Sequence, residues 1–147
     1  MSTYSSLHYH IVFSTKNRLR LIGHSWETTL HEYLGGTTRG LGGFPQEIGG
    51  VEDHVHMLVG LKTSHCIADF VRELKKATSR WVHEEFGLRQ FAWQEGYGVF
   101  SISATSRDRV KQYIASQRDH HRQRGFREEL IDLLKRAGVE FDPKYLE

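Results

Sequence analysis

Alternating apolar and polar side chains predict four strands along the chain. Residues 7–14 and 97–104 each place apolar side chains at every second position, as half-buried strands do. Residues 51–61 repeat this alternation, and residues 44–51 form a less regular strand-like stretch just before them. The glycine pair at 49 and 50 predicts a bulge or tight turn between these last two strands.

Apolar residues at helical spacing predict four helices between and after these strands. The predicted helices cover residues 26–41, 64–86, 107–124 and 126–137, and Gly87 and Gly138 are typical stop residues. A serine precedes three of these segments, and serine side chains are favoured N-caps. The expected caps are Ser25, Ser64 and Ser106.

The element order is strand, helix, strand, strand, helix, strand, followed by two helices. This order predicts an α+β fold of the ferredoxin-like (split β-α-β) type. We expect an antiparallel sheet with the first two helices on one face and two added C-terminal helices. The whole chain, residues 1–147, is expected to form a single domain, with a core at about 5–104 and C-terminal helices at 106–137. The second face of the sheet is expected to stay open for a ligand or partner.

Composition narrows the class of protein. The chain has 147 residues, 38% apolar and 26% charged, which is ordinary for one globular domain. Its net charge of +2 permits a nucleic-acid partner without requiring one. The single cysteine, Cys66, excludes an internal disulfide and fits a reducing cytoplasm. We see neither a signal peptide nor an apolar run of membrane-spanning length.

Two histidines stand out in the third predicted strand. His54 and His56 are two positions apart, so both imidazoles project from one face while Val55 and Met57 project from the other. Neutral imidazoles side by side are good metal ligands. For the pair alone, a strand with two partly exposed histidines is the commoner explanation, so a site requires further groups.

The third predicted helix offers two such groups. Tyr113 and Gln117 are four residues apart, which places a phenol and a carboxamide on one helix face. The pattern is weak by itself, because ordinary surface packing explains most instances. His120 and His121 follow one turn later, where a solvated helix end is the simpler interpretation.

Four segments together resemble a known family. They are residues 9–16 (YHIVFSTK), 51–59 (VEDHVHMLV), 93–101 (WQEGYGVFS) and 113–121 (YIASQRDHH). Because the four segments occur in this order, the chain resembles the HUH-type single-tyrosine transposases of the insertion sequence 200/605 group. The resemblance extends over nearly the whole chain.

This resemblance implies a site and an activity. It assigns His54, His56 and Gln117 as ligands of a divalent metal, Mg²⁺ or Mn²⁺, and Tyr113 as the catalytic nucleophile. It implies a DNA transposase that cleaves and rejoins single-stranded DNA at hairpin-bearing element ends through a 5′-phosphotyrosine intermediate. It also implies a homodimer in which the helix carrying Tyr113 serves the histidines of the partner subunit.

Basic and aromatic side chains are candidates for contacts with DNA. The candidate phosphate contacts are Lys16, Arg18, Arg20, Arg72, Lys75, Lys76 and Arg80. Trp93, Tyr97 and Phe100 are candidates for stacking on bases, although burial in the core is the commoner role of such residues.

Other functions fit parts of the same pattern. One is a ferredoxin-like module that binds single-stranded nucleic acid without catalysis. Another is a relative of the transposase recruited to a host role. A third is a zinc hydrolase that uses His54, His56 and either His120 or His121, with water as the nucleophile.

Overall fold

The fold is built on one four-stranded antiparallel sheet. A computed structural model describes residues 2–120 and 124–146 of the chain. The strands are β1 (His8–Ser14), β2 (Phe44–Val51), β3 (His54–Gly60) and β4 (Gly98–Ile102). They lie in the order β2-β3-β1-β4, with antiparallel pairing throughout. This is the split β-α-β order, so the predicted fold class is confirmed.

The helices divide into an early pair and a C-terminal group. They are α1 (Glu27–Gly40), α2 (Ile67–Phe86), α3 (Arg107–Ala115), α4 (Gln117–His120) and α5 (Phe126–Ala137), with short 3₁₀ turns η1 (Lys16–Arg18), η2 (Ala104–Ser106) and η3 (Pro143–Tyr145). Within the described ranges, no helix is long and apolar enough to span a membrane.

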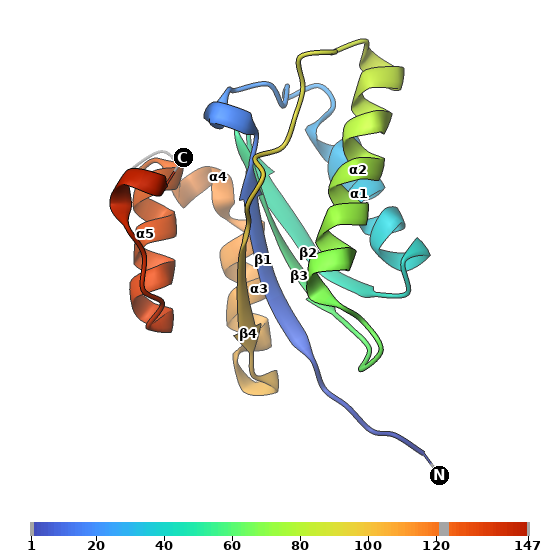
Figure 1. Cartoon of the computed structure of the whole chain (residues 1–147), viewed down its shortest axis with the longest axis vertical. Helices are drawn as coiled ribbons and strands as arrows, with labels where there is room; N and C mark the ends of the chain where they lie inside the picture. Colours follow the sequence, from blue (N-terminus) through green and yellow to red (C-terminus); the bar gives the residue numbers. More distant parts are fainter. Residues whose placement is uncertain (1, 121–123, 147) are drawn as a thin grey trace.

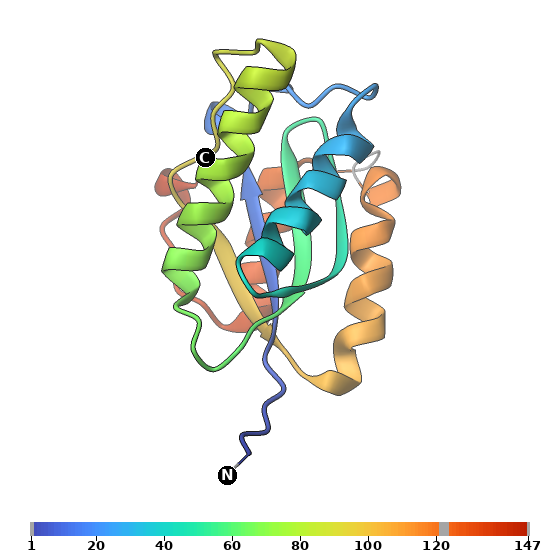
Figure 2. The ribbon, with the colours of Figure 1, turned by 90° about the vertical axis from the view of Figure 1, so that its right-hand side faces the viewer.

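The first face of the sheet carries the main hydrophobic core. α1 and α2 lie side by side across this face (Figures 1 and 2). Ile11 and Phe13 of β1 and Val55, Met57 and Val59 of β3 point into the core and are fully buried. The alternation seen in the sequence therefore predicts this face correctly, because successive strand residues point to opposite sides.

The second face of the sheet is covered, so the expectation of an open face is wrong. α3, α4 and α5 lie on the side opposite α1 and α2 (Figure 1). Val12 of β1 packs there with Phe126 and Leu130 of α5 in a second, smaller core. The apolar side of α5 needs a partner surface, and this part of the sheet supplies it.

The predicted helix at 107–124 is divided in two, which corrects the sequence expectation. α3 ends at Ala115, and Ser116 has non-helical backbone angles (φ −102°, ψ 24°). The Ser116 hydroxyl donates to the carbonyl oxygen of Gln112 at 2.8 Å, and such bonds compete with regular helix geometry. Gln117 therefore begins α4 and does not continue the helix of Tyr113.

The predicted helix caps are also corrected. The N-cap residues of α1 and α2 are Trp26 and Cys66, not the predicted serines. Ser106 is the N-cap residue of α3, as predicted. None of the three side chains makes a cap hydrogen bond. In contrast, α2 and α5 end at Gly87 and Gly138, both left-handed with φ of 65° and 70°, as predicted.

Gly49 positions α3 against β2. The predicted bulge at the glycine pair lies instead between Pro45 and Glu47, and Gly49 pairs regularly with His56. A Cβ at Gly49 would overlap the backbone carbonyl of Ile114, the residue after Tyr113. The missing side chain thus permits α3 to pack directly on the sheet beside the histidine strand.

Candidate active site

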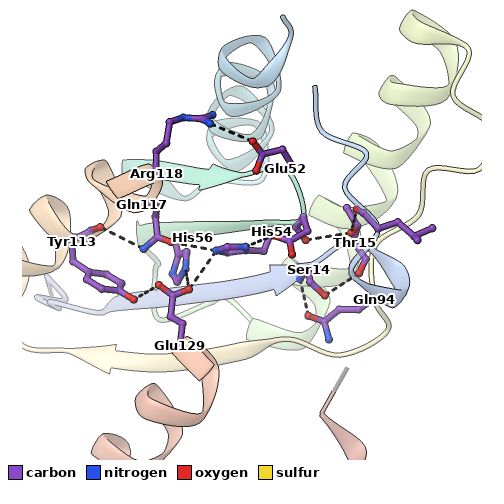
Figure 3. Close-up of polar contacts among 12 residues, drawn as sticks. Ser14, Thr15, Glu52, His54, His56, Gln94, Tyr113, Gln117, Arg118 and Glu129 are labelled. Atoms are coloured by element: carbon purple, nitrogen blue, oxygen red, sulfur yellow. Dashed lines mark hydrogen bonds and ion pairs between the residues drawn. The ribbon is translucent and has the colours of Figure 1, made fainter. Parts of the chain in front are cut away.

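The two histidines of β3 lie together beneath the C-terminal helices. His54 and His56 are both fully buried on the second face, with ring centroids 5.1 Å apart. Their Nε2 atoms lie 3.3 and 2.8 Å from the same atom, Oε1 of Glu129 (Figure 3). The strand pattern correctly predicts that the imidazoles share one face, but burial replaces the expected exposure.

Glu129 is a site residue that the sequence prediction missed. It lies on α5, is fully buried, and accepts a hydrogen bond from the Tyr113 hydroxyl through Oε2. One feature of the sequence could have revealed Glu129: it lies three residues after Phe126 and four before Leu133, on the apolar side of the helix. A carboxylate in such a stripe is rarely placed there without a partner.

Gln117 and Tyr113 join the same cluster despite the break between α3 and α4. Gln117 is 1% exposed, and its Oε1 lies 3.2 Å from Nε2 of His54. Its Nε2 donates to the backbone carbonyl of Tyr113 at 3.5 Å. The structure therefore brings together all four residues singled out on β3 and the third predicted helix, within one chain.

Further polar groups hold the two imidazoles from behind. Asp53 Oδ1 lies 2.7 Å from His54 Nδ1, and His10 Nε2 lies 2.7 Å from His56 Nδ1. Neither Asp53 nor His10 was among the predicted site residues. His10 shares a face of β1 with Val12, so strand periodicity places it on the same side of the sheet as the histidine pair.

Burial and charge shift the ionisation of these groups in different directions. Burial, the largest single influence on His54, lowers its pKa, but hydrogen bonds to Asp53 and Glu129 together raise it to about 9. Burial and then the neighbouring His56 lower the pKa of His10 to about 3. Burial and then Glu129 raise the pKa of Tyr113, so the phenol is protonated at neutral pH.

The cluster suits a divalent metal ion. One ligand atom each from His54, His56 and Glu129 lies within 4.8 Å of the others, and Gln117 adds a carboxamide oxygen beside them. Neighbouring ligands of one cation, with bonds of about 2.1 Å, lie about 3.0–3.4 Å apart, close to the separations measured here. Hydrogen bonds from the far side of each imidazole are also typical of metal-binding histidines.

The comparison with protein families decides the chain's membership. The model described as "Transposase IS200 like" matches residues 3–117. The chain belongs to the IS200-like transposase family. The match includes β1, β3 and α3, but it ends at Gln117 and so excludes α5 and Glu129.

Individual relatives agree with this assignment. The ISDra2 transposase TnpA of Deinococcus radiodurans is 27% identical over 121 residues, which cover 77% of this transposase and 85% of the relative. A crystal structure of a Deinococcus radiodurans R1 protein assigned as a transposase matches with a TM-score of 0.65 and 27% identity, covering 80% of this chain and 95% of that one. A REP-associated tyrosine transposase bound to a REP hairpin shares the fold, with a TM-score of 0.61, 17% identity and coverage of 82% and 74%.

Part of the predicted DNA-contact set lies away from the site. Arg72, Lys75, Lys76 and Arg80 are on α2, on the other face of the sheet of this transposase. The Lys75 ammonium donates to the carbonyl oxygens of Gln94 and Gly96 at 2.8 and 2.6 Å, and burial lowers its pKa to about 8. It therefore ties α2 to the segment before β4.

The other part of that set lies beside the site. Lys16, Arg18 and Arg20 belong to the loop after β1, where the Thr15 N–H donates to the carbonyl oxygen of Asp53 at 2.8 Å. Asp53 is the carboxylate that holds His54. The loop thus starts next to the histidine pair.

The candidate stacking residues have different environments. Trp93 is 7% exposed, packs against Phe13 and donates to the Thr78 hydroxyl at 3.0 Å, so it is a core residue. Phe100 packs on the second core, and Tyr97 is 36% exposed. Burial of Trp93 rules out a stacking role for that residue.

A cavity of about 680 Å³ between β4, α3 and α5 reaches Tyr113. His10 and Phe100 line its inner part together with Tyr113. Its other lining residues include three arginines: Arg109, Arg124 and Arg136. We name this cavity, defined by these six residues, the basic cavity. Asp132 also lines it and pairs with Arg136 at 3.1 Å and with Arg124 at 3.8 Å.

The zinc-hydrolase alternative depends on residues that are not described. His121 lies outside the described residues, and the side chain of His120 is not described either. On the Nε2 side of His54 and His56, the described group with metal-ligand spacing is completed by the carboxylate of Glu129. A third imidazole, that of His10, contacts Nδ1 of His56 from the other side.

Proposed function

We propose that this IS200-like transposase cleaves and rejoins single-stranded DNA through a 5′-phosphotyrosine intermediate on Tyr113. The observation that carries the proposal is the buried cluster in which the Tyr113 hydroxyl is one carboxylate away from the imidazoles of His54 and His56. Hairpin-bearing element ends are the proposed substrate, since a relative with the same fold is described with a hairpin bound.

The proposed metal ligands are His54, His56 and Gln117. A divalent cation held by them, Mg²⁺ or Mn²⁺, supplies positive charge to the scissile phosphate. To bind it, each imidazole must present a lone pair on Nε2, so His54 must release the proton that its raised pKa retains at neutral pH. The Asp53 carboxylate accepts a hydrogen bond from the Nδ1–H of His54 and so keeps Nε2 directed at the site.

Tyr113 supplies the nucleophile. Its oxygen bonds to phosphorus while the bond between phosphorus and the 3′-oxygen breaks. The phenol proton ends on that oxygen as the free 3′-hydroxyl, and the 5′-phosphate stays on the tyrosine. Because the phosphodiester is exchanged for a phosphotyrosine ester, rejoining needs no external energy source. The raised pKa of Tyr113 means that the phenol enters the reaction protonated.

The DNA path runs through the basic cavity to Tyr113. Arg109, Arg124 and Arg136 offer fork-shaped donors for phosphate oxygens on the approach. The loop carrying Lys16, Arg18 and Arg20 contacts the same strand beyond the site, and the basic residues of α2 contact more distant DNA. Both sheet faces are covered within the described ranges, which argues against a module that binds nucleic acid on an exposed sheet.

One subunit carries the whole set of proposed residues. Tyr113, Glu129 and His56 are connected by hydrogen bonds within one chain. The homodimer implied by the family resemblance stays the proposed assembly, in which each subunit uses its own α3 and its own histidines.

The test is a search for the covalent adduct. Incubation with 5′- or 3′-labelled single-stranded hairpin DNA and Mg²⁺ or Mn²⁺, followed by denaturing electrophoresis, should give a protein–DNA conjugate that carries the 5′-phosphate side of the cut. Tyr113→Phe should abolish the conjugate and retain DNA binding in a gel-shift assay. A conjugate of unchanged yield in Tyr113→Phe would contradict the assignment, whereas DNA binding without a conjugate in the wild type would indicate a binding module or a relative recruited to a host role.

A further inference from the structure

Glu129 uses both carboxylate oxygens within the site. Oε1 is shared by the two imidazoles of β3, and Oε2 accepts from the Tyr113 hydroxyl. We propose that Glu129 is a fourth ligand of the metal ion and also the residue that fixes the nucleophile. This inference rests on the proposed function and adds a residue that lies beyond the family match at 3–117.

The placement of Glu129 is unfavourable unless its partners compensate for it. Burying a carboxylate costs several kcal/mol unless opposite charge and hydrogen bonds compensate. Glu129 is fully buried on a helix whose neighbouring inward residues, Phe126 and Leu130, belong to the second core. A leucine there would pack without that cost, so the carboxylate is explained by what it contacts.

The position of Oε1 is that of a ligand. Its distances to Nε2 of His56 and His54 are 2.8 and 3.3 Å, and Oε1 of Gln117 lies 3.2 Å from the latter. Two donors that share a cation at right-angled or tetrahedral positions lie about 3.0–3.4 Å apart. These three separations are close to those of ligands that share one cation, and the ligand atoms of His54, His56 and Glu129 all lie within 4.8 Å of one another.

The donor chemistry points the same way. Two imidazoles and one amide form an uncharged set, and imidazoles are unusual ligands for Mg²⁺. Glu129 adds a negative oxygen donor, which raises affinity for Mg²⁺ and Mn²⁺ and leaves two positions of an octahedron for the substrate. A carboxylate therefore makes the site more suitable for the metals that the family resemblance implies.

α5 holds Glu129 in a defined register. The Phe126 ring packs on the His54 ring, with centroids 4.5 Å apart, and Leu130 packs with Val12 of β1. These contacts lie one turn or less from Glu129 along the helix, so the carboxylate cannot shift independently of them. Through its two oxygens, Glu129 then sets the distance between the metal centre and Tyr113.

The first experiment measures metal binding without DNA. Mn²⁺ is titrated into the full-length wild type, Glu129→Gln and Glu128→Gln by calorimetry. Glu128 is exposed on the same helix, so the control removes the same charge outside the cluster. Glu129→Gln should weaken Mn²⁺ binding by about 10-fold or more, and Glu128→Gln by less than about 2-fold. Unchanged Mn²⁺ affinity in a folded Glu129→Gln protein would overturn the ligand role.

The second experiment separates metal binding from positioning of the tyrosine. Single-turnover adduct formation on hairpin DNA is measured at saturating Mn²⁺. If Glu129 only bound metal, saturation would restore the rate of Glu129→Gln; we expect a loss of about 10-fold or more to persist, because Tyr113 is no longer fixed. Full restoration, or a rate above wild type, would overturn the positioning role.

Two controls keep the test decisive. Circular dichroism and thermal unfolding establish that each variant is folded. If Glu129→Gln does not fold, Glu129→Asp, which keeps the charge and withdraws it by one methylene, takes its place with the same expectations. If wild-type protein forms no adduct, the proposed function fails, but the Mn²⁺ titration still decides the ligand role.

Discussion

The two faces of the sheet are filled in opposite ways. On the first face, apolar side chains such as Met57 and Val55 pack under α1 and α2 with no ionisable group among the buried core residues. On the second face, the equally buried His54, His56 and Glu129 are linked by hydrogen bonds under α3, α4 and α5. The same strand β3 thus contributes core packing from one side and the proposed metal ligands His54 and His56 from the other.

The contrast indicates where stability and function are separable. Apolar contacts are non-directional and tolerate small changes of shape, whereas the polar cluster depends on individual atom pairs. Substitutions on the first face should change the free energy of unfolding, and those on the second should change cleavage with smaller effects on folding.

Substitutions of two neighbouring residues of β3, Met57 and His56, should differ most in their effects on stability and on cleavage. Met57→Ala should lower the free energy of unfolding by about 2–5 kcal/mol through a core cavity, while folded molecules keep their cleavage rate. His56→Ala should abolish adduct formation and cost about 1–3 kcal/mol, because Glu129 loses a buried partner. Urea unfolding and adduct yield per folded molecule measure the two effects. Similar profiles for both variants would contradict the division between faces.

Gly49 tests how closely α3 must pack on β2. Gly49→Ala places a methyl group against the Ile114 carbonyl, so α3 must move away and carry Tyr113 with it. We expect adduct formation to fall by about 10-fold or more, since small displacements of a reacting group are costly. Gly36→Ala is the matched control: no atom lies within 4 Å of its added Cβ, and alanine favours the helix by about 0.5–1 kcal/mol. Equal adduct rates for wild type and both variants would show that α3 tolerates the shift.

The smallest expected effect is the change in the stability of the folded protein with pH. Burial lowers the pKa of His54, but Asp53 and Glu129 raise it above the ordinary 6.5, to about 9. A group whose pKa is raised by folding stabilises the folded state below its unfolded pKa and loses this contribution as pH rises through the folded value. The metal-free protein should therefore lose stability between pH 6.5 and 9. Thermal unfolding in EDTA measures this loss, which Asp53→Asn should reduce; a melting temperature independent of pH would contradict the charge pairing.

The first face could be predicted from sequence because it depends on local periodicity, and the strand order could be predicted because the order of elements matches the split β-α-β type. The alternation around Met57 assigns one side of β3 to the core, and the glycines at 87 and 138 end helices by their own backbone preference. Both features are properties of short segments. They do not require knowledge of what packs on them.

The second face could only partly be predicted. The family resemblance selected His54, His56, Gln117 and Tyr113, and the structure brings these together. It did not select Glu129, whose position depends on how α5 packs against β1 and β3. Nor did periodicity reveal the break at Ser116, where a serine hydroxyl competes with the helix for the Gln112 carbonyl. Such features depend on tertiary contacts that periodicity does not encode.

The proposed cleavage site is complete within one chain. The most direct measurement mixes two inactive variants, Tyr113→Phe and His54→Ala, and assays adduct formation on hairpin DNA. If each tyrosine acts beside the histidines of its own subunit, the mixture stays as inactive as either variant alone. Recovery of a substantial fraction of wild-type adduct on mixing would show that α3 serves the partner subunit and would contradict the account.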